Sequence, residues 1–218
     1  MEALVYSYRG PLKDLSYSGS AAVVNSEGTL LWYCGDPQRI VYLRSSAKPM
    51  QAMCVLESGA ADAYGLTEEE LAVICSSHSG EAFHVAAVRS ILSKAGLGEA
   101  SLQCGVHAPL NEAAARALAQ SGQAPGQVHN NCSGKHTGML MTAKYLGEPL
   151  EDYYKPEHPV QQRILGMIAD ICGYQRESII LGIDGCGVPV HALPLYHAAW
   201  GAARMACPKT LGSRAGHA

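Results

Sequence analysis

The chain has 218 residues, of which 48% are hydrophobic and 16% charged, with a formal net charge of −3. That composition excludes a disordered polyelectrolyte, and the scattered basic residues argue against nucleic acid as a partner. No apolar run approaches the length of a membrane span and the first residues do not resemble a signal peptide, so we expect a cytoplasmic protein that does not bind membranes.

The first half of the chain is predicted to contain a β-hairpin, a third strand and three helices. Apolar segments around a polar turn predict the hairpin. The helices are indicated by Pro49 at the start of the first, a capping box from Thr67 to Glu70 before the second, and Gly96 at the end of the third. In chain order, these predicted elements are strands at 21–24 and 29–33, a strand at 40–43, and helices at 48–59, 67–74 and 81–95.

The second half is predicted to be mainly helical, with one buried strand. Asn111 has the character of a helix cap, and Pro159 opens an amphipathic helix with Val160, Ile164, Ile168 and Ile171 on one face. The predicted elements are helices at 111–122, 139–146 and 159–171, a strand at 178–183, and glycine-containing bends at 129–136 and 184–189. We therefore expect one α/β domain over residues 1–206 and a frayed tail over 207–218.

Ser45-Ser46-Ala47-Lys48 is the first candidate for chemistry. On a helix, positions three apart share a face, which would place Ser45 beside Lys48. A desolvated lysine can take the proton of a serine and make it a nucleophile. Ser46 cannot have the same role, because Pro49 stands three residues after it. The alternative is a solvated helix start without function.

Ser76-Ser77-His78-Ser79-Gly80-Glu81 is the second candidate. Hydroxyls and an imidazole where a loop meets a helix suit hydrogen bonding to a substrate, and N–H groups at a helix start suit an oxyanion. The alternative is ordinary capping of the next helix by Ser79.

The two glycine-containing bends could hold a metal ion. Cys132 would need a partner, either His129, His136 or, from the second bend, Cys186. Asp184 follows a strand, a common position for substrate contacts. The remaining cysteines are expected to be reduced and packed as small hydrophobes. For each bend alone, the alternative is a tight turn.

Four motifs together resemble the asparaginase II family of thermolabile, rhizobial-type L-asparaginases. They are Arg44-Ser45-Ser46-Ala47-Lys48-Pro49, Ser77-His78-Ser79-Gly80-Glu81, His129-Asn130-Asn131-Cys132-Ser133-Gly134-Lys135-His136 and Gly182-Ile183-Asp184-Gly185-Cys186-Gly187-Val188-Pro189. The resemblance implies a fold similar to serine β-lactamases and glutaminases, with an antiparallel sheet and helices. It also implies hydrolysis of L-asparagine and a homodimer.

The resemblance further implies roles for individual residues. Ser45 matches the nucleophile, Lys48 its base and Ser77 a second active-site serine; the family's zinc site falls on Cys132, Lys135 and Cys186. We expect Arg44, His78 and Asp184 to hold the α-carboxylate and α-amino groups of the substrate, with the individual assignments open.

The chain also departs from this family, whose members continue well beyond residue 218. The partner lysine of the second serine normally comes from that later part, so we expect a C-terminally truncated chain with an exposed sheet edge. The competing hypotheses are another Ser-x-x-Lys hydrolase, such as a glutaminase or a penicillin-interacting enzyme, and a zinc-binding protein or inactive fragment without turnover.

Overall fold

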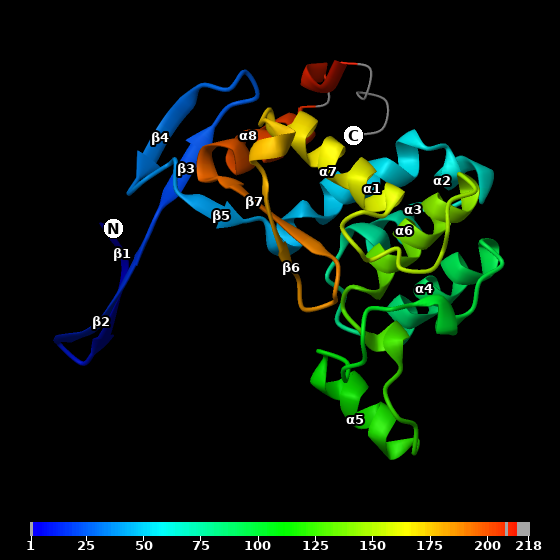
Figure 1. The fold of residues 1–218 in the computed structure, drawn as a ribbon. Helices are drawn as coiled ribbons and strands as arrows, with labels where there is room; N and C mark the ends of the chain where they lie inside the picture. The colour runs from blue at the N-terminus through cyan, green and yellow to red at the C-terminus, as the bar shows by residue number, and fades with distance from the viewer. Residues whose placement is uncertain (1, 208, 213–218) are drawn as a thin grey trace.

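A bundle of helices makes up most of the molecule, and small antiparallel sheets lie along one side of it (Figure 1). The computed structural model describes residues 2–207 and 209–212. Its mixed α/β architecture with antiparallel sheets agrees with the predicted fold class. Among the described residues, no helix has both the length and the apolar character needed to cross a membrane.

The strands form three separate sheets within the described residues. The order is β1–β2, β3–β4 and β5–β7–β6, all antiparallel. Their bounds are β1 Glu2–Arg9, β2 Leu12–Gly19, β3 Ala21–Val24, β4 Leu30–Cys34, β5 Ile40–Tyr42, β6 Ile180–Ile183 and β7 Pro189–Pro194. The predicted hairpin (β3–β4) and the predicted strand at 40–43 are confirmed. The strand predicted at 178–183 is present as β6, but the prediction that it is buried is wrong: Ile180 is 52% and Ile183 82% exposed, because β6 lies at the edge of its sheet. The hairpin β1–β2 and the central strand β7 were not predicted.

The helices carry the core and the site. Short 3₁₀ helices are η1 Arg44–Ala47, η2 Glu99–Ser101, η3 Gln127–His129 and η4 Arg176–Ser178. The α-helices are α1 Lys48–Glu57, α2 Ala60–Ala63, α3 Glu68–Cys75, α4 Ala82–Lys94, α5 Glu112–Gln120, α6 Ser133–Tyr145, α7 Pro159–Cys172 and α8 Leu195–Met205.

Local sequence explains several of these boundaries. Thr67 and Glu70 form the predicted capping box of α3, and the Asn111 side chain accepts the N–H of Ala114 at the start of α5. The apolar face predicted for α7, including Ile164 and Ile168, is buried in the core. These helix starts are confirmed because each depends on side-chain contacts within a few residues.

Helix α6 lies at the centre of the bundle, packed against α1, α3 and α4. Every residue from Ser133 to Ala143 is buried. The predicted bend at 129–136 is wrong in its second half, because the bend ends at Cys132 and Ser133 to His136 form the first turn of α6. A helix that is buried on all sides and contains polar residues lacks the amphipathic pattern that marks a surface helix.

The end of the chain contains a short helical turn. Residues 209–212 form this turn, and Leu211 is buried against the core. The rest of the predicted frayed tail, residues 208 and 213–218, lies outside the described residues.

Candidate active site and thiol cluster

Two serines and one lysine form a continuous hydrogen-bonded chain. Lys48 Nζ lies 2.7 Å from Ser77 Oγ, which lies 2.8 Å from Ser45 Oγ. Lys48 is only 1% exposed, whereas both serines face solvent. The chain therefore connects a buried amine to a hydroxyl that a substrate can reach.

Ser77 lies between the two residues that the sequence predicts to be in contact. Ser45 is in η1 and Lys48 opens α1; the Lys48 backbone N–H donates to the Ser45 carbonyl, but no hydrogen bond joins their side chains within the described part of the chain. The Lys48 amine turns instead toward the loop that follows α3, where the Ser76 carbonyl and the Ser77 hydroxyl accept its hydrogens. A buried amine needs several acceptors, and that loop supplies them.

Three hydrogen-bond acceptors surround the amine of Lys48. Its Nζ lies 2.7 Å from the carbonyl oxygen of Ser76 and 3.2 Å from that of Asn131. These two carbonyls can take both hydrogens of the amine when it is neutral, which would leave its lone pair for a proton from Ser77. Burial lowers the pKa of Lys48; the thiol of Cys132 opposes this effect and the charge of Lys135 adds to it.

Ser45 is reached through an unusual turn of the backbone. Leu43, the residue after β5, donates its N–H to the carbonyl of His191 in β7, and Arg44 then adopts a left-handed conformation with φ of 50°. A non-glycine residue there costs about 1 kcal/mol. The neighbouring Ser46 donates its hydroxyl to Leu43, so it faces away from the hydrogen-bonded chain.

Arg44 and Asp184 pair with each other at the edge of the site. Arg44 Nε lies 3.1 Å from Asp184 Oδ1; the arginine side chain is 67% exposed and that of Asp184 only 13%. A guanidinium has five N–H donors, so the exposed part of Arg44 keeps donors for another anion. The pair brings together two of the three residues predicted to hold substrate.

His78, the third residue predicted to hold substrate, is enclosed. It is 2% exposed; its Nδ1 accepts the N–H of Gly80, and its Nε2 lies 2.8 Å from Ser133 Oγ. Because Ser133 donates its own hydrogen to the carbonyl of Val128, His78 donates through Nε2. Both ring nitrogens are occupied, and His78 therefore positions the loop after α3 against the start of α6.

The helix after His78 begins without the predicted serine cap. Glu81 is the N-cap residue of α4, and no side chain caps the helix there. The Ser79 hydroxyl donates to the Glu81 carboxylate instead. The capping alternative for Ser79 is therefore wrong.

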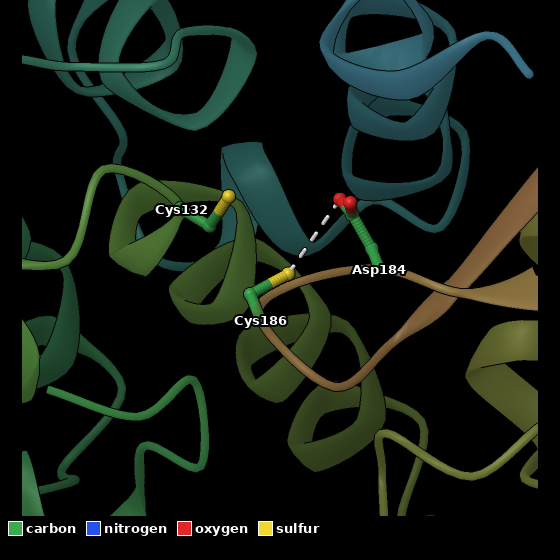
Figure 2. A group of neighbouring side chains, drawn as sticks. All are labelled: Cys132, Asp184 and Cys186. Carbon is green, nitrogen blue, oxygen red and sulfur yellow. Dashed lines mark hydrogen bonds between the residues drawn. The ribbon is translucent and has the colours of Figure 1, made fainter.

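The two predicted cysteines meet beside the serine–lysine chain. Cys132, Cys186 and Asp184 present one ligand atom each, all within 4.8 Å of one another (Figure 2). Cys132 is the N-cap residue of α6, while Asp184 and Cys186 come from the bend between β6 and β7. Segments far apart in the sequence thus form one compact group. Asp184 is a potential metal ligand in this group, a role that the motifs alone did not indicate.

Lys135 lies against the same group. Its Nζ is 3.2 Å from Cys186 Sγ and 3.9 Å from Asp184 Oδ2, and its side chain is 4% exposed. His129, considered as a ligand from the sequence, turns its Nδ1 to the backbone of Gly126 instead. Two sulfurs and a carboxylate form a donor set that zinc accepts, whereas a lysine must lose its proton to join it.

The surroundings of the two thiols shift their pKa values in opposite directions. A hydrogen bond from Cys186, together with Lys135 and Lys48, lowers the pKa of Cys132 to about 6. The same contact raises the pKa of Cys186, and burial adds to this effect. In the metal-free pair the proton therefore stays on Cys186 and the thiolate forms on Cys132.

Two asparagines hold the loop that carries Cys132. Asn130 Oδ1 accepts the N–H of Cys132 at 2.8 Å, and its Nδ2 donates to the carbonyl of Cys104. Asn131 donates its N–H to His107 Nε2 at 3.0 Å while its carbonyl accepts from Lys48. Sequence reasoning missed His107, because only the tertiary structure brings it to this loop.

The site residues described above all lie in a region of the chain that matches a known protein family. Residues 5–217 match the family described as L-asparaginase II, and the matched region includes every site residue described above. No curated protein matches the chain. Since the match covers nearly the whole sequence, this chain belongs to the L-asparaginase II family.

Proposed function

We propose that this chain hydrolyses the side-chain amide of L-asparagine to L-aspartate and ammonia through an acyl-enzyme on Ser45. Membership of the L-asparaginase II family gives an L-asparaginase-type activity in general terms. The observation that carries the mechanism is the hydrogen-bonded chain from Lys48 through Ser77 to Ser45. It provides a path by which the exposed hydroxyl can lose its proton to a buried amine.

The first half-reaction transfers the acyl group to the protein. Neutral Lys48 takes the proton of Ser77 as Ser77 takes that of Ser45, and Ser45 Oγ bonds to the carboxamide carbon. The proton returns through the same chain to the amide nitrogen, the C–N bond breaks, and ammonia leaves. An ester between Ser45 and the aspartyl group remains.

Water completes the reaction. It attacks the ester carbon while its proton passes to the chain, the bond to Ser45 Oγ breaks, and Ser45 regains its proton as aspartate is released. Arg44 is the residue that we propose for the α-carboxylate of the substrate, since its exposed donors face solvent while Asp184 holds its Nε. His78 contributes by positioning the Ser77 loop.

We also propose that Cys132, Cys186 and Asp184 hold a zinc ion, with Lys135 as a further ligand if it is deprotonated. The donor set fits, because soft thiolates favour zinc and the three ligand atoms lie close together. Bound zinc would supply a positive charge beside the pocket and tie the β6–β7 bend to α6.

An assay of ammonia release from L-asparagine tests the proposal. Ser45→Ala and Lys48→Arg should each reduce kcat by at least about 10³-fold, since one removes the nucleophile and the other replaces the base by a group that stays protonated. Ser46→Ala, next to the nucleophile but outside the chain, should stay within about threefold of wild type. Full activity of Ser45→Ala would exclude the acyl-enzyme on Ser45.

The competing functions give different outcomes in parallel assays. Faster turnover of L-glutamine or of a β-lactam would favour another hydrolase with the same serine–lysine pair. Zinc binding without ammonia release would favour a metal-binding protein without turnover, a function that the thiol cluster alone supports. Cys132→Ser should then abolish metal binding.

A further inference from the structure

Two fully buried side chains lie next to the thiol cluster of Cys132, Cys186 and Asp184, and the mechanism above does not use them. His136 in α6 and Tyr153, in the segment before α7, are both 0% exposed. His136 Nδ1 lies 2.6 Å from Tyr153 Oη, and Tyr153 Oη accepts the backbone N–H of Gln103 at 2.9 Å. These hydrogen bonds connect the backbone at Gln103, through Tyr153, to His136, which directly follows Lys135 in α6.

The hydrogen bonds fix the tautomer of His136. Because the Tyr153 oxygen accepts from Gln103, its own hydrogen goes to His136 Nδ1. A ring whose Nδ1 accepts this hydrogen is neutral, since a charged imidazolium donates from both nitrogens. A neutral ring that accepts at Nδ1 carries its hydrogen on Nε2.

The Nε2–H of His136 lacks a partner of standard hydrogen-bond geometry within the described part of the chain. Leaving a buried N–H without an acceptor costs about 1–3 kcal/mol. The Cys186 thiol is the side chain in contact with this ring, and because Tyr153 occupies Nδ1 the contact falls to Nε2. His136 is not among the grouped ligand atoms of Cys132, Asp184 and Cys186, so it is a neighbour of this cluster and not one of its ligands.

We propose that Tyr153 and His136 are positioning residues of the thiol cluster, with Tyr153 fixing the tautomer in which His136 Nε2–H donates to the sulfur of metal-bound Cys186. This inference rests on the metal site in the proposed function. When Cys186 gives up its proton to bind a metal, its sulfur becomes an acceptor that needs a donor in a buried place. Such outer contacts to metal ligands change metal affinity by about 10–100-fold.

The tautomer can be measured without any metal. Nitrogen-15 NMR of the histidine-labelled chain should show His136 as the Nε2–H form, with its signals assigned by their loss in His136→Gln. Tyr153→Phe removes the donor to Nδ1 while keeping the ring, so the tautomers should become mixed. An Nδ1–H form in the wild-type chain would overturn the proposal.

Cobalt binding tests the donor to Cys186. Co²⁺ reports thiolate ligation through its sulfur-to-metal charge-transfer absorption, and chelator competition gives the Kd. His136→Gln places an amide nitrogen near the position of Nε2, whereas His136→Asn places one near Nδ1. The Kd of His136→Gln for Co²⁺ should therefore lie within about threefold of the wild-type value. The Kd values of His136→Asn and Tyr153→Phe should be about tenfold higher or more.

Each outcome decides the matter. Equal affinity in all variants, a weak Gln variant beside a tight Asn variant, or no cobalt binding by the wild-type chain would each contradict the proposal. Circular dichroism confirms that the variants compared are folded. Neither experiment measures ammonia, and Ser45→Ala should bind cobalt as wild type does. A chain without amidase activity that still shows the predicted order of affinities would refute the proposed function alone.

Discussion

Around the site, burial and the number of hydrogen-bond partners determine which side chains are charged. Lys48 has two carbonyls and one hydroxyl around its amine, and burial lowers its pKa. His78 accepts at one nitrogen and donates at the other, which only a neutral ring can do. The fold therefore fixes the protonation state of His78, and it shifts the pKa of Lys48 below that of an exposed lysine.

His78 should make the protein sensitive to acid. Burial, with His84, Lys48, His107 and His129 facing it, lowers the pKa of His78 from 6.5 to about 4. The unfolded chain then binds more protons than the folded one in this range, so stability is lost as the pH falls. We expect the free energy of unfolding to fall by about 3 kcal/mol between pH 7 and pH 4 from this group.

Urea denaturation across this pH range provides the measurement. Burial also lowers the pKa of His191 to about 4, so His191 adds a similar pH dependence to the stability. This contribution is present in both wild type and the His78→Gln variant and cancels in their comparison. The glutamine of His78→Gln cannot titrate. The slope of its unfolding free energy against pH should therefore be smaller than that of wild type, by the amount that corresponds to the uptake of about one proton on unfolding. An equal slope in wild type and variant would show that His78 does not titrate in this way.

At the scale of elements, close packing of α6 against α3 sets the position of the site. Gly134, in the first turn of α6, faces the backbone of Val73 in α3, and a Cβ there would lie 2.4 Å from the Val73 carbonyl oxygen. The two helices can approach this closely only because this position has no side chain. Lys135 and Cys132, on either side of Gly134, are thereby held near the serine–lysine chain.

Gly134→Ala should therefore destabilise the protein by about 1–3 kcal/mol through overpacking. Gly166→Ala in α7 is the matched control: its new Cβ would meet its nearest neighbour, Arg176 Nη1, at 3.8 Å, an ordinary contact. That variant should gain up to about 1 kcal/mol from the better helix propensity of alanine. Thermal unfolding of both variants checks the difference, and equal effects would contradict the role of Gly134.

At the scale of the whole molecule, the hairpin β1–β2 stands apart from the body (Figure 1). Large apolar side chains on both strands are exposed, among them Tyr8, Leu12 and Tyr17. A two-stranded hairpin is only marginally stable in water by itself. The core, in contrast, lies between the helices and β7 and receives no buried side chain from this hairpin within the described residues.

Deleting residues 3–18 should leave the unfolding free energy of the body within about 1 kcal/mol of that of the full chain, because these residues bury no core side chain. Urea denaturation followed by tryptophan fluorescence measures this, since Trp200 donates to the backbone of Ser26 within the body. A loss well above 2 kcal/mol would show that the hairpin stabilises the body.

Elements that depend on local contacts were predictable from the sequence. The β3–β4 hairpin and the starts of α3, α5 and α7 follow from turns, caps and proline within a few residues. Strand β7 was not predictable: it begins and ends with proline, and its pairing with β5 joins residues about 150 positions apart. The exposed hairpin β1–β2 also lacks the alternation of a half-buried sheet.

By itself, the sequence determined which chemical groups are available: Ser45, Lys48 and Ser77, two thiols in glycine-containing bends, and the family to which their motifs belong. Only the tertiary structure decided how those groups are connected. It placed Ser77 next to Lys48, joined Asp184 to the thiols, and enclosed His78. The physical reason is that residue identity fixes reactivity, whereas contacts between segments 29 to 55 positions apart depend on how the helices and the β6–β7 bend pack together.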